Sequence, residues 1–125
     1  MKIEVSNGEI IDKITILKIK LEKIKNPDKL VNIQKENDLL HDYMQMIKVD
    51  ENHPLFQKLY EINLKLWEVE DLLRIKETRK EFDQEFIELA RSVYFINDNR
   101  AAVKRDINQV SGSDLFEEKE YVNYK

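Results

Sequence analysis

The sequence contains no cysteine and very little glycine or proline. Without cysteine, disulfide bonds and thiolate metal sites are excluded, and this composition is typical of a reducing compartment. No apolar run approaches the roughly 20 residues that a membrane span requires, and residues 1–5 are too short and too charged for a signal peptide. The two glycines are isolated, so the sequence lacks a phosphate-binding glycine loop. We therefore expect a cytoplasmic protein with no membrane partner.

Charged residues are abundant, and the two signs are nearly balanced. They make up 37% of the chain, with 25 acidic against 21 basic side chains. An acidic net charge argues against general binding to nucleic acid, which requires a basic surface. The basic residues Arg100, Lys104 and Arg105 nevertheless lie close together, just before an acidic segment at 114–120. Because Lys, Glu, Leu and Ile are frequent while glycine and proline are scarce, we predict long helices and an all-α fold.

Apolar spacing and capping residues predict two helices in the first half of the chain. Ser6 and Glu9 fit a capping box that starts the first helix, and an apolar stripe follows at alternating spacings of three and four. Asn26 and Pro27 end this helix and start a second, because asparagine favours the N-cap and proline the first helical position. The second helix is predicted to run to about Ile47.

The second half of the chain predicts two further long helices. One begins near Pro54 and has heptad-like apolar spacing, which favours nearly antiparallel packing against a neighbour. Its periodicity weakens around Thr78, which fits another capping box with Glu81, so a break or kink is expected there. A second candidate for a break lies at Asn97, and helix is predicted to continue to about Val110.

The length of 125 residues is that of one domain. Residues 1–5 form a short N-terminal arm, and Ser111-Gly112-Ser113 ends the last helix and opens a tail. Leucine and aromatic side chains in this tail provide apolar surface for docking on the body. We predict a single helical domain over 1–125, an antiparallel bundle of four to five helices with a docked C-terminal tail at 111–125.

Three polar stripes follow the spacing of a helical face. They consist of Glu9, Lys13 and Lys20; of Asn63, Trp67, Glu70 and Arg74; and of Asn97, Arg100, Lys104 and Asn108. Charge-rich helices also produce such stripes as solvated faces with local ion pairs, and this alternative stays open. If the three faces converge, they form a cationic pocket in which arginine and lysine side chains hold a carboxylate or phosphate.

The pocket hypothesis assigns roles to individual side chains. Ligand binding is assigned to Lys13, Asn63, Trp67, Arg74, Arg91, Asn97, Arg100, Lys104, Asn108, Ser113, Lys119 and Tyr121. General acid or base catalysis is assigned to Glu70 or Glu118, provided that burial raises its pKa. Trp67 has a plainer alternative as a core or interface residue, and the segment around Ser113 has one as a helix C-cap.

No metal site and no cofactor are predicted. Acidic residues at 68–71 and 83–88 raise the idea of a magnesium site between two helices, since hard cations need several carboxylate oxygens. The spacings in the two segments do not match, however, and neither His41 nor His53 has a partner at metal-ligand spacing. No serine has the histidine and carboxylate partners of a catalytic triad.

A series of short motifs, spread over nearly the whole chain, resembles the pattern of a known family. The motifs are Gly8 to Leu17, Asn63 with Leu66 to Asp71 and Arg74, Leu89 to Arg91 with Val93-Tyr94, Asn97-Asp98, Arg100 to Ala102, Lys104, Ile107-Asn108, Gly112-Ser113 and Glu117 to Lys119 with Tyr121. This pattern is similar to an uncharacterised bacterial family of short helical proteins, whose members also occur appended to tetratricopeptide-repeat or glycosyltransferase-type proteins. The resemblance implies no established activity. It implies that the polar stripes belong to the family's pattern, and it hints at cell-surface sugar metabolism.

Three functions are compatible with these residues. The first is binding of an anionic small molecule, such as a phosphorylated sugar or a sugar nucleotide. The second is an interaction or assembly module that forms a homodimer through its heptad-like helix and exposed aromatic residues. The third is an enzyme similar to the all-helical chorismate mutases, which hold a dicarboxylate with arginine and lysine and need no metal. Whether the chain is an enzyme stays open.

Overall fold

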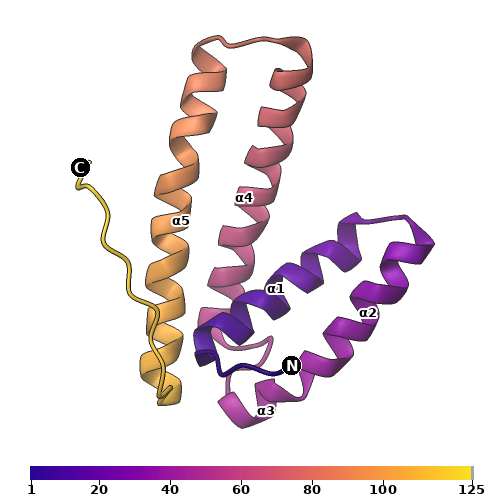
Figure 1. The fold of residues 1–125 in the computed structure, drawn as a ribbon, viewed down its shortest axis with the longest axis vertical. Helices are drawn as coiled ribbons and strands as arrows, with labels where there is room; N and C mark the ends of the chain where they lie inside the picture. Colours follow the sequence, from indigo (N-terminus) through magenta and orange to yellow (C-terminus); the bar gives the residue numbers. More distant parts are fainter. Residues whose placement is uncertain (125) are drawn as a thin grey trace.

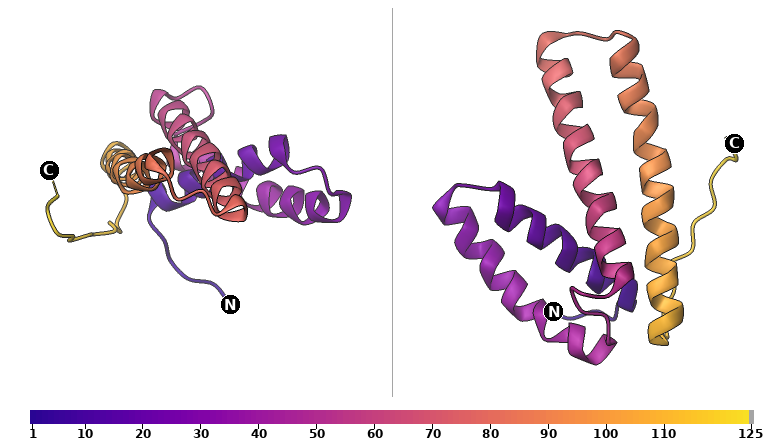
Figure 2. Two further views of the ribbon diagram at one scale, coloured as in Figure 1. Left: turned by 90° about the horizontal axis from the view of Figure 1, so that it is seen from above. Right: turned by 180° about the vertical axis from the view of Figure 1, so that it is seen from behind.

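Two helical hairpins make up the fold (Figure 1). In this computed structural model, which describes residues 1–124, the elements are α1 (Asn7–Lys23), α2 (Pro27–His41), α3 (Tyr43–Ile47), α4 (Pro54–Arg79) and α5 (Gln84–Ser111). The long helices α4 and α5 form one antiparallel hairpin, and α1 and α2 form a shorter hairpin that crosses its lower half (Figures 1 and 2). The prediction of an all-α helical bundle is confirmed.

Three of the predicted helix ends form as the sequence indicates. The Glu9 backbone N–H donates to the Ser6 side chain at 3.2 Å and starts α1. The Asn26 side chain accepts from the backbone N–H of Asp28 at 3.0 Å, and α2 begins at the following proline. Gly112 takes the left-handed conformation, with a φ of 67°, and caps the C-terminus of α5. Short-range capping chemistry therefore sets these boundaries.

Three other details of the helices differ from the sequence prediction. The break between the long helices lies where it was expected, but Thr78 belongs to the last turn of α4 and Asp83 caps α5 instead. The last helix continues through Asn97 without interruption. The helix predicted from Pro27 to Ile47 is interrupted at Asp42, and its end forms the separate short helix α3.

The shorter hairpin covers only the lower half of α4 and α5, and the apolar core divides accordingly. The larger cluster lies where α1 meets the long hairpin and consists of Ile11, Ile14, Met44, Ile47, Val49, Phe56, Leu59, Val103 and Ile107. The smaller cluster, formed by Leu66, Val69 and Ile96, joins α4 to α5 further up. Because apolar burial supplies most of the stabilisation, the lower half holds the fold together.

The tail, residues 113–124, lies beside α5 on the side away from α4 (Figures 1 and 2). Its side chains bond to α5 through Glu117 to Lys104, Glu118 to Arg105, and the Tyr124 hydroxyl to Asp98, among other contacts. Aromatic contacts add to this docking, because the Tyr124 ring packs edge-on against Tyr94 and Phe95 of α5. No helix within residues 1–124 is both long and apolar enough to cross a membrane.

Candidate functional site

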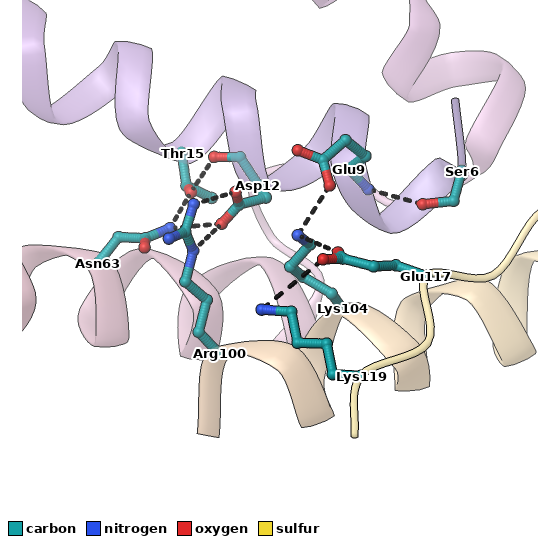
Figure 3. Close-up of polar contacts among 9 residues, drawn as sticks. All are labelled: Ser6, Glu9, Asp12, Thr15, Asn63, Arg100, Lys104, Glu117 and Lys119. Carbon is teal, nitrogen blue, oxygen red and sulfur yellow. Dashed lines mark hydrogen bonds and ion pairs between the residues drawn. The ribbon is translucent and has the colours of Figure 1, made fainter. Parts of the chain in front are cut away.

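A buried carboxylate, Asp12 of α1, lies at the centre of a polar network between three helices (Figure 3). Arg100 of α5 binds it at two points, with Nε 2.9 Å from Oδ1 and a terminal nitrogen 2.5 Å from Oδ2. The Asn63 amide of α4 donates to Asp12 Oδ1 and to Thr15 Oγ1, both at 2.9 Å. We call these four residues the Asp12 network. Only 2% of the Asp12 side chain is exposed, and no buried side-chain nitrogen or oxygen in residues 1–124 lacks a hydrogen-bond partner.

The network favours the charged form of Arg100 and engages its guanidinium with Asp12. The hydrogen bond that Arg100 donates to Asp12 raises the pKa of Arg100, although partial burial of the guanidinium acts in the opposite direction. Both carboxylate oxygens of Asp12 bind the same guanidinium, so the two-point binding geometry of Arg100 is taken up by a contact within the protein. The primary role of this pair is therefore to lock α1 against α5.

One turn further along α5, Lys104 forms the second charged centre. Its ammonium lies 2.7 Å from a Glu9 carboxylate oxygen and 3.0 Å from a Glu117 oxygen, and its side chain is 10% exposed. Burial lowers the pKa of Lys104, but hydrogen bonds to these two carboxylates outweigh it, so the net shift is upward. Lys104 in turn lowers the pKa of Glu117. Lys119, 3.7 Å from the same glutamate, adds a second positive charge (Figure 3).

The start of α1 is fixed against the end of α5 by contacts that require a glycine. The backbone N–H of Gly8 donates to Asn108 Oδ1 at 2.6 Å, and that of Asn7 donates to Ser113 Oγ at 3.1 Å. A Cβ added to Gly8 would lie 2.4 Å from the Lys104 carbonyl oxygen. Only glycine allows the two backbones to approach this closely.

A small cavity opens beside Lys104, between α5 and the tail. Its volume is about 180 Å³, and three cationic side chains line it: Lys104, Arg105 and Lys119. The tail glutamates Glu117 and Glu118 also line it, and each pairs with one of these cations. We call this space the Lys104 cavity. Its charged walls and its position make it the best candidate for a binding site in the described part of the chain.

The structure brings about half of the predicted ligand-binding residues to this region. Asn63, Arg100, Lys104, Asn108 and Ser113 all contact α1 or the residues that surround its start. Lys119 lines the Lys104 cavity. Asn63, Asn108 and Ser113 bond to α1 within the protein, and the sequence pattern alone does not distinguish such contacts from ligand contacts.

The remaining predicted ligand-binding residues lie elsewhere. Lys13 points to α2 and pairs with Glu36 at 3.1 Å. Trp67 and Arg74 lie on α4, about one and three turns beyond Asn63, and the Arg74 side chain is 72% exposed. Arg91 is exposed on α5. Asn97 and Tyr121 line a second cavity between α5 and the end of the tail.

The two predicted catalytic residues also lie apart from each other. Glu118 is in the tail, its side chain is 72% exposed, and it pairs with Arg105 at 2.6 Å. Glu70 is half-buried on α4, two turns beyond Asn63. Among residues 1–124, no three acidic or histidine side chains come together closely enough to hold a metal ion.

Sequence reasoning missed Asp12 and Thr15, which are central to the network. It assigned the polar face of the first helix to Lys13 and its neighbours, because those residues also follow helical spacing. Of the predicted stripe, only Glu9 bonds to α5, through Lys104, whereas Gly8 and Asp12 bond to Asn108 and Arg100 of α5 and Thr15 bonds to Asn63 of α4. One signal was present: Asp12 directly follows Ile11, in the most apolar part of the helix, where an unpaired charge is costly.

The fold and this site define a small all-α protein in which an internal ionic network joins the first helix to the last. A model of a family of unknown function, DUF6165, matches residues 1–124. The chain therefore belongs to this family, as the resemblance of its motifs had indicated. No match was found among curated proteins or among solved structures.

Proposed function

We propose that this protein binds an anionic small molecule, a phosphorylated sugar or a sugar nucleotide, at the Lys104 cavity. The observation that supports this is the pairing of tail carboxylates with the cations of the cavity, Glu117 with Lys104 and Glu118 with Arg105. Carboxylate oxygens and phosphate oxygens bind the same donors. The tail glutamates thus occupy the positions that the oxygens of a ligand would take.

Binding is then an exchange of one anion for another. A ligand phosphate displaces Glu117, which keeps Lys104 paired throughout, so the buried ammonium is never left without a counter-ion. A phosphate carries more negative charge than one carboxylate, and this difference favours the ligand. At about 180 Å³ the closed cavity holds the anionic group alone, and the rest of the ligand extends along α5 or replaces part of the tail.

Thermal unfolding and calorimetry against phosphate, pyrophosphate, sugar phosphates and sugar nucleotides test this proposal. A ligand at 100 times its dissociation constant adds about 2.7 kcal/mol to the free energy of unfolding, which is a rise of roughly 10 °C in Tm for a domain of this size. Glu117→Gln should strengthen binding, because it removes the competing charge.

Matched variants separate the cavity from general charge effects. Lys104→Met should weaken binding at least tenfold, whereas Lys13→Met, which removes a lysine paired on the far side of α1, should leave the affinity unchanged. Arg105→Gln provides a milder test, since this side chain is exposed and its loss threatens the fold less. If none of these anions binds the wild-type chain, the proposal is wrong.

A second candidate function is that of an assembly module that forms a homodimer. It is favoured by four exposed apolar side chains on the part of the long hairpin that α1 does not cover: Leu72, Ile75, Phe82 and Ile87. Pairing two such hairpins would complete a four-helix bundle. Light scattering at micromolar concentration should then give a dimer mass that Ile75→Glu reduces to the monomer value. A wild-type monomer at every concentration would refute this candidate.

The proposal also covers the cellular location and the alternative of an enzyme. A cytoplasmic location agrees with the absence of cysteine, and cell fractionation tests it. The alternative of a chorismate-mutase-like enzyme requires arginine to hold a substrate carboxylate, whereas Arg100 already binds Asp12 at two points. The contacts of Arg100 therefore favour ligand binding at Lys104 over that alternative.

A further inference from the structure

A second, larger cavity lies beside α5, next to the end of the tail. Its volume is about 660 Å³, and its lining includes Tyr94, Asn97, Asp98, Lys119, Tyr121 and Tyr124. Ligand sites for small organic molecules typically measure roughly 300–1,000 Å³, so this cavity is large enough for a ring system. We call it the tyrosine cavity.

The tyrosine cavity offers aromatic surface to a ligand. The side chains of Tyr94 and Tyr121 remain 42% and 70% exposed, although both line it. Tyr94 is held in place by Tyr124, whose ring centroid lies 4.8 Å away at an interplanar angle of 71°. Exposed aromatic rings whose positions are fixed by neighbours are suited to stacking on planar rings, and such stacking tolerates different bases.

The polar groups of this cavity fit a nucleoside better than a plain apolar ring. The Asn97 amide combines a donor and an acceptor, as the edge of a nucleobase does. The Asp98 carboxylate accepts a hydrogen bond from the Tyr124 hydroxyl, and a carboxylate can also accept one from a ribose hydroxyl. Aromatic, amide and carboxylate groups together match a base attached to a sugar.

The two cavities are joined by one residue. Lys119 lines both the Lys104 cavity and the tyrosine cavity. On α5, Asp98 of one cavity and Ala101 of the other are three residues apart, which is a rise of about 5 Å along a helix. A ligand that extends along α5 can therefore place a charged end beside Lys104 and a ring beside Tyr94, with Lys119 between them.

We propose that the tyrosine cavity holds the base and ribose of a nucleoside diphosphate whose phosphates lie in the Lys104 cavity. This inference rests on the proposed anion site and names the class of its ligand. Stacking on an aromatic side chain corresponds to roughly fivefold to hundredfold in affinity per base. The base should therefore contribute measurably to binding beyond the phosphates.

Calorimetry with the full chain tests the inference through four probes: pyrophosphate, ribose 5-phosphate, uridine diphosphate and adenosine diphosphate. We expect both nucleoside diphosphates to bind at least tenfold more tightly than pyrophosphate. Tyr94→Ala should remove this advantage and leave pyrophosphate binding within twofold. Tyr43→Ala, which changes an exposed tyrosine on α3, should leave all four affinities unchanged.

The outcomes distinguish this inference from the proposed function. If pyrophosphate binds and the nucleoside diphosphates bind no more tightly, the tyrosine cavity is not a nucleoside site, while the anion site stands. If ribose 5-phosphate matches the nucleoside diphosphates, the cavity recognises a sugar and the inference is wrong. If no probe binds, the proposed function fails and this inference with it. Should Tyr94→Ala unfold, nuclear Overhauser effects between base protons and the Tyr94 ring in the wild-type chain provide the same test.

Discussion

Arg100 and Asp12 lie 88 residues apart in the sequence and form a two-point ion pair in the core of the interface between α1 and α5. The Asp12 side chain is almost completely buried, and 27% of the Arg100 side chain is exposed. A paired charge in this setting tolerates burial, whereas an unpaired one does not. Loss of either partner therefore affects the whole fold.

Replacing Arg100 by methionine should lower the free energy of unfolding by about 3 kcal/mol, because a buried carboxylate then loses its counter-ion. Asp12→Ala should have an effect of similar size. The double variant should lose less free energy of unfolding than the two single variants together. Urea unfolding of the wild type, both single variants and the double variant gives this coupling energy. Asp38→Ala, an exposed aspartate bonded to Gln34 on α2, should change stability by no more than about 0.5 kcal/mol. Additive losses would show that the pair is not coupled.

The two glycines should respond differently to alanine, since they are required for different reasons. A Cβ at Gly8 would meet the Lys104 carbonyl oxygen at 2.4 Å, and the backbone of α5 has to move to relieve this contact. We expect Gly8→Ala to cost at least about 2 kcal/mol in thermal unfolding.

Gly112 serves as the comparison. A Cβ there meets nothing within 4 Å, but the φ of 67° strains any residue with a side chain. Gly112→Ala should therefore cost about 1 kcal/mol, and Gly112→Asn less, because asparagine tolerates the left-handed conformation. A smaller loss in Gly8→Ala than in Gly112→Ala would contradict the close approach of α1 and α5.

Docking of the tail should weaken in acid. Lys104 lowers the pKa of Glu117 in the folded chain, so the contribution of Glu117 to docking is present above its unfolded pKa of about 4.3 and is lost as the pH falls through the lower folded value. Backbone amide shifts of residues 113–124, followed from pH 7 to pH 2, should show this release. In Glu117→Gln the transition should be smaller, because only the Glu118 and Asp98 contacts remain to be lost, and an unchanged transition in that variant would assign it to another group.

Two tyrosines should ionise late at alkaline pH. A hydrogen bond with Glu22 raises the pKa of Tyr60 to about 12, and one with Asp98 raises the pKa of Tyr124 to about 12. Both values exceed the unfolded value of about 10, so the contributions of these bonds to stability are complete below pH 10 and are lost as the pH approaches 12. Absorbance at 295 nm measures tyrosinate formation.

The carboxylate partners provide the controls for this titration. Glu22→Gln should move the ionisation of Tyr60 to lower pH, and Asp98→Asn should do so for Tyr124. Each variant should remove about half of the absorbance change near pH 12. A titration curve that neither variant alters would show that these hydrogen bonds do not control the two hydroxyls.

Local patterns in the sequence predicted the helices well. Apolar spacing and the capping residues Ser6, Asn26 and Gly112 each act within a few residues, and the structure confirms them. Two members of the last two polar stripes, Asn63 and Arg100, lie against α1 in the structure, where they bond to Asp12, whereas the sequence pattern assigned them to ligand binding.

The crossing of the two hairpins could not be predicted in the same way. It depends on contacts between residues that are far apart, such as Asn63 with Thr15 and Gly8 with Asn108. Several faces of a charged helix have the same periodicity, so spacing does not identify which one is buried. For this reason Lys13 was assigned to the pocket, whereas Asp12, the preceding residue, lies in the interface.

The bond between Gly8 and Asn108 spans 100 residues, and this separation constrains how the chain folds during synthesis. Ribosomes add roughly 5–20 residues per second, so about 5–20 seconds pass between the appearance of α1 and that of its partner segment. Until α5 has emerged, the Asp12 carboxylate lacks the Arg100 guanidinium that binds it, and the apolar side of α1 lacks its contacts with Val103 and Ile107. The contacts of α1 are thus completed only long after α1 itself has been made. Chains that stop before Arg100 should remain targets for chaperones and proteases.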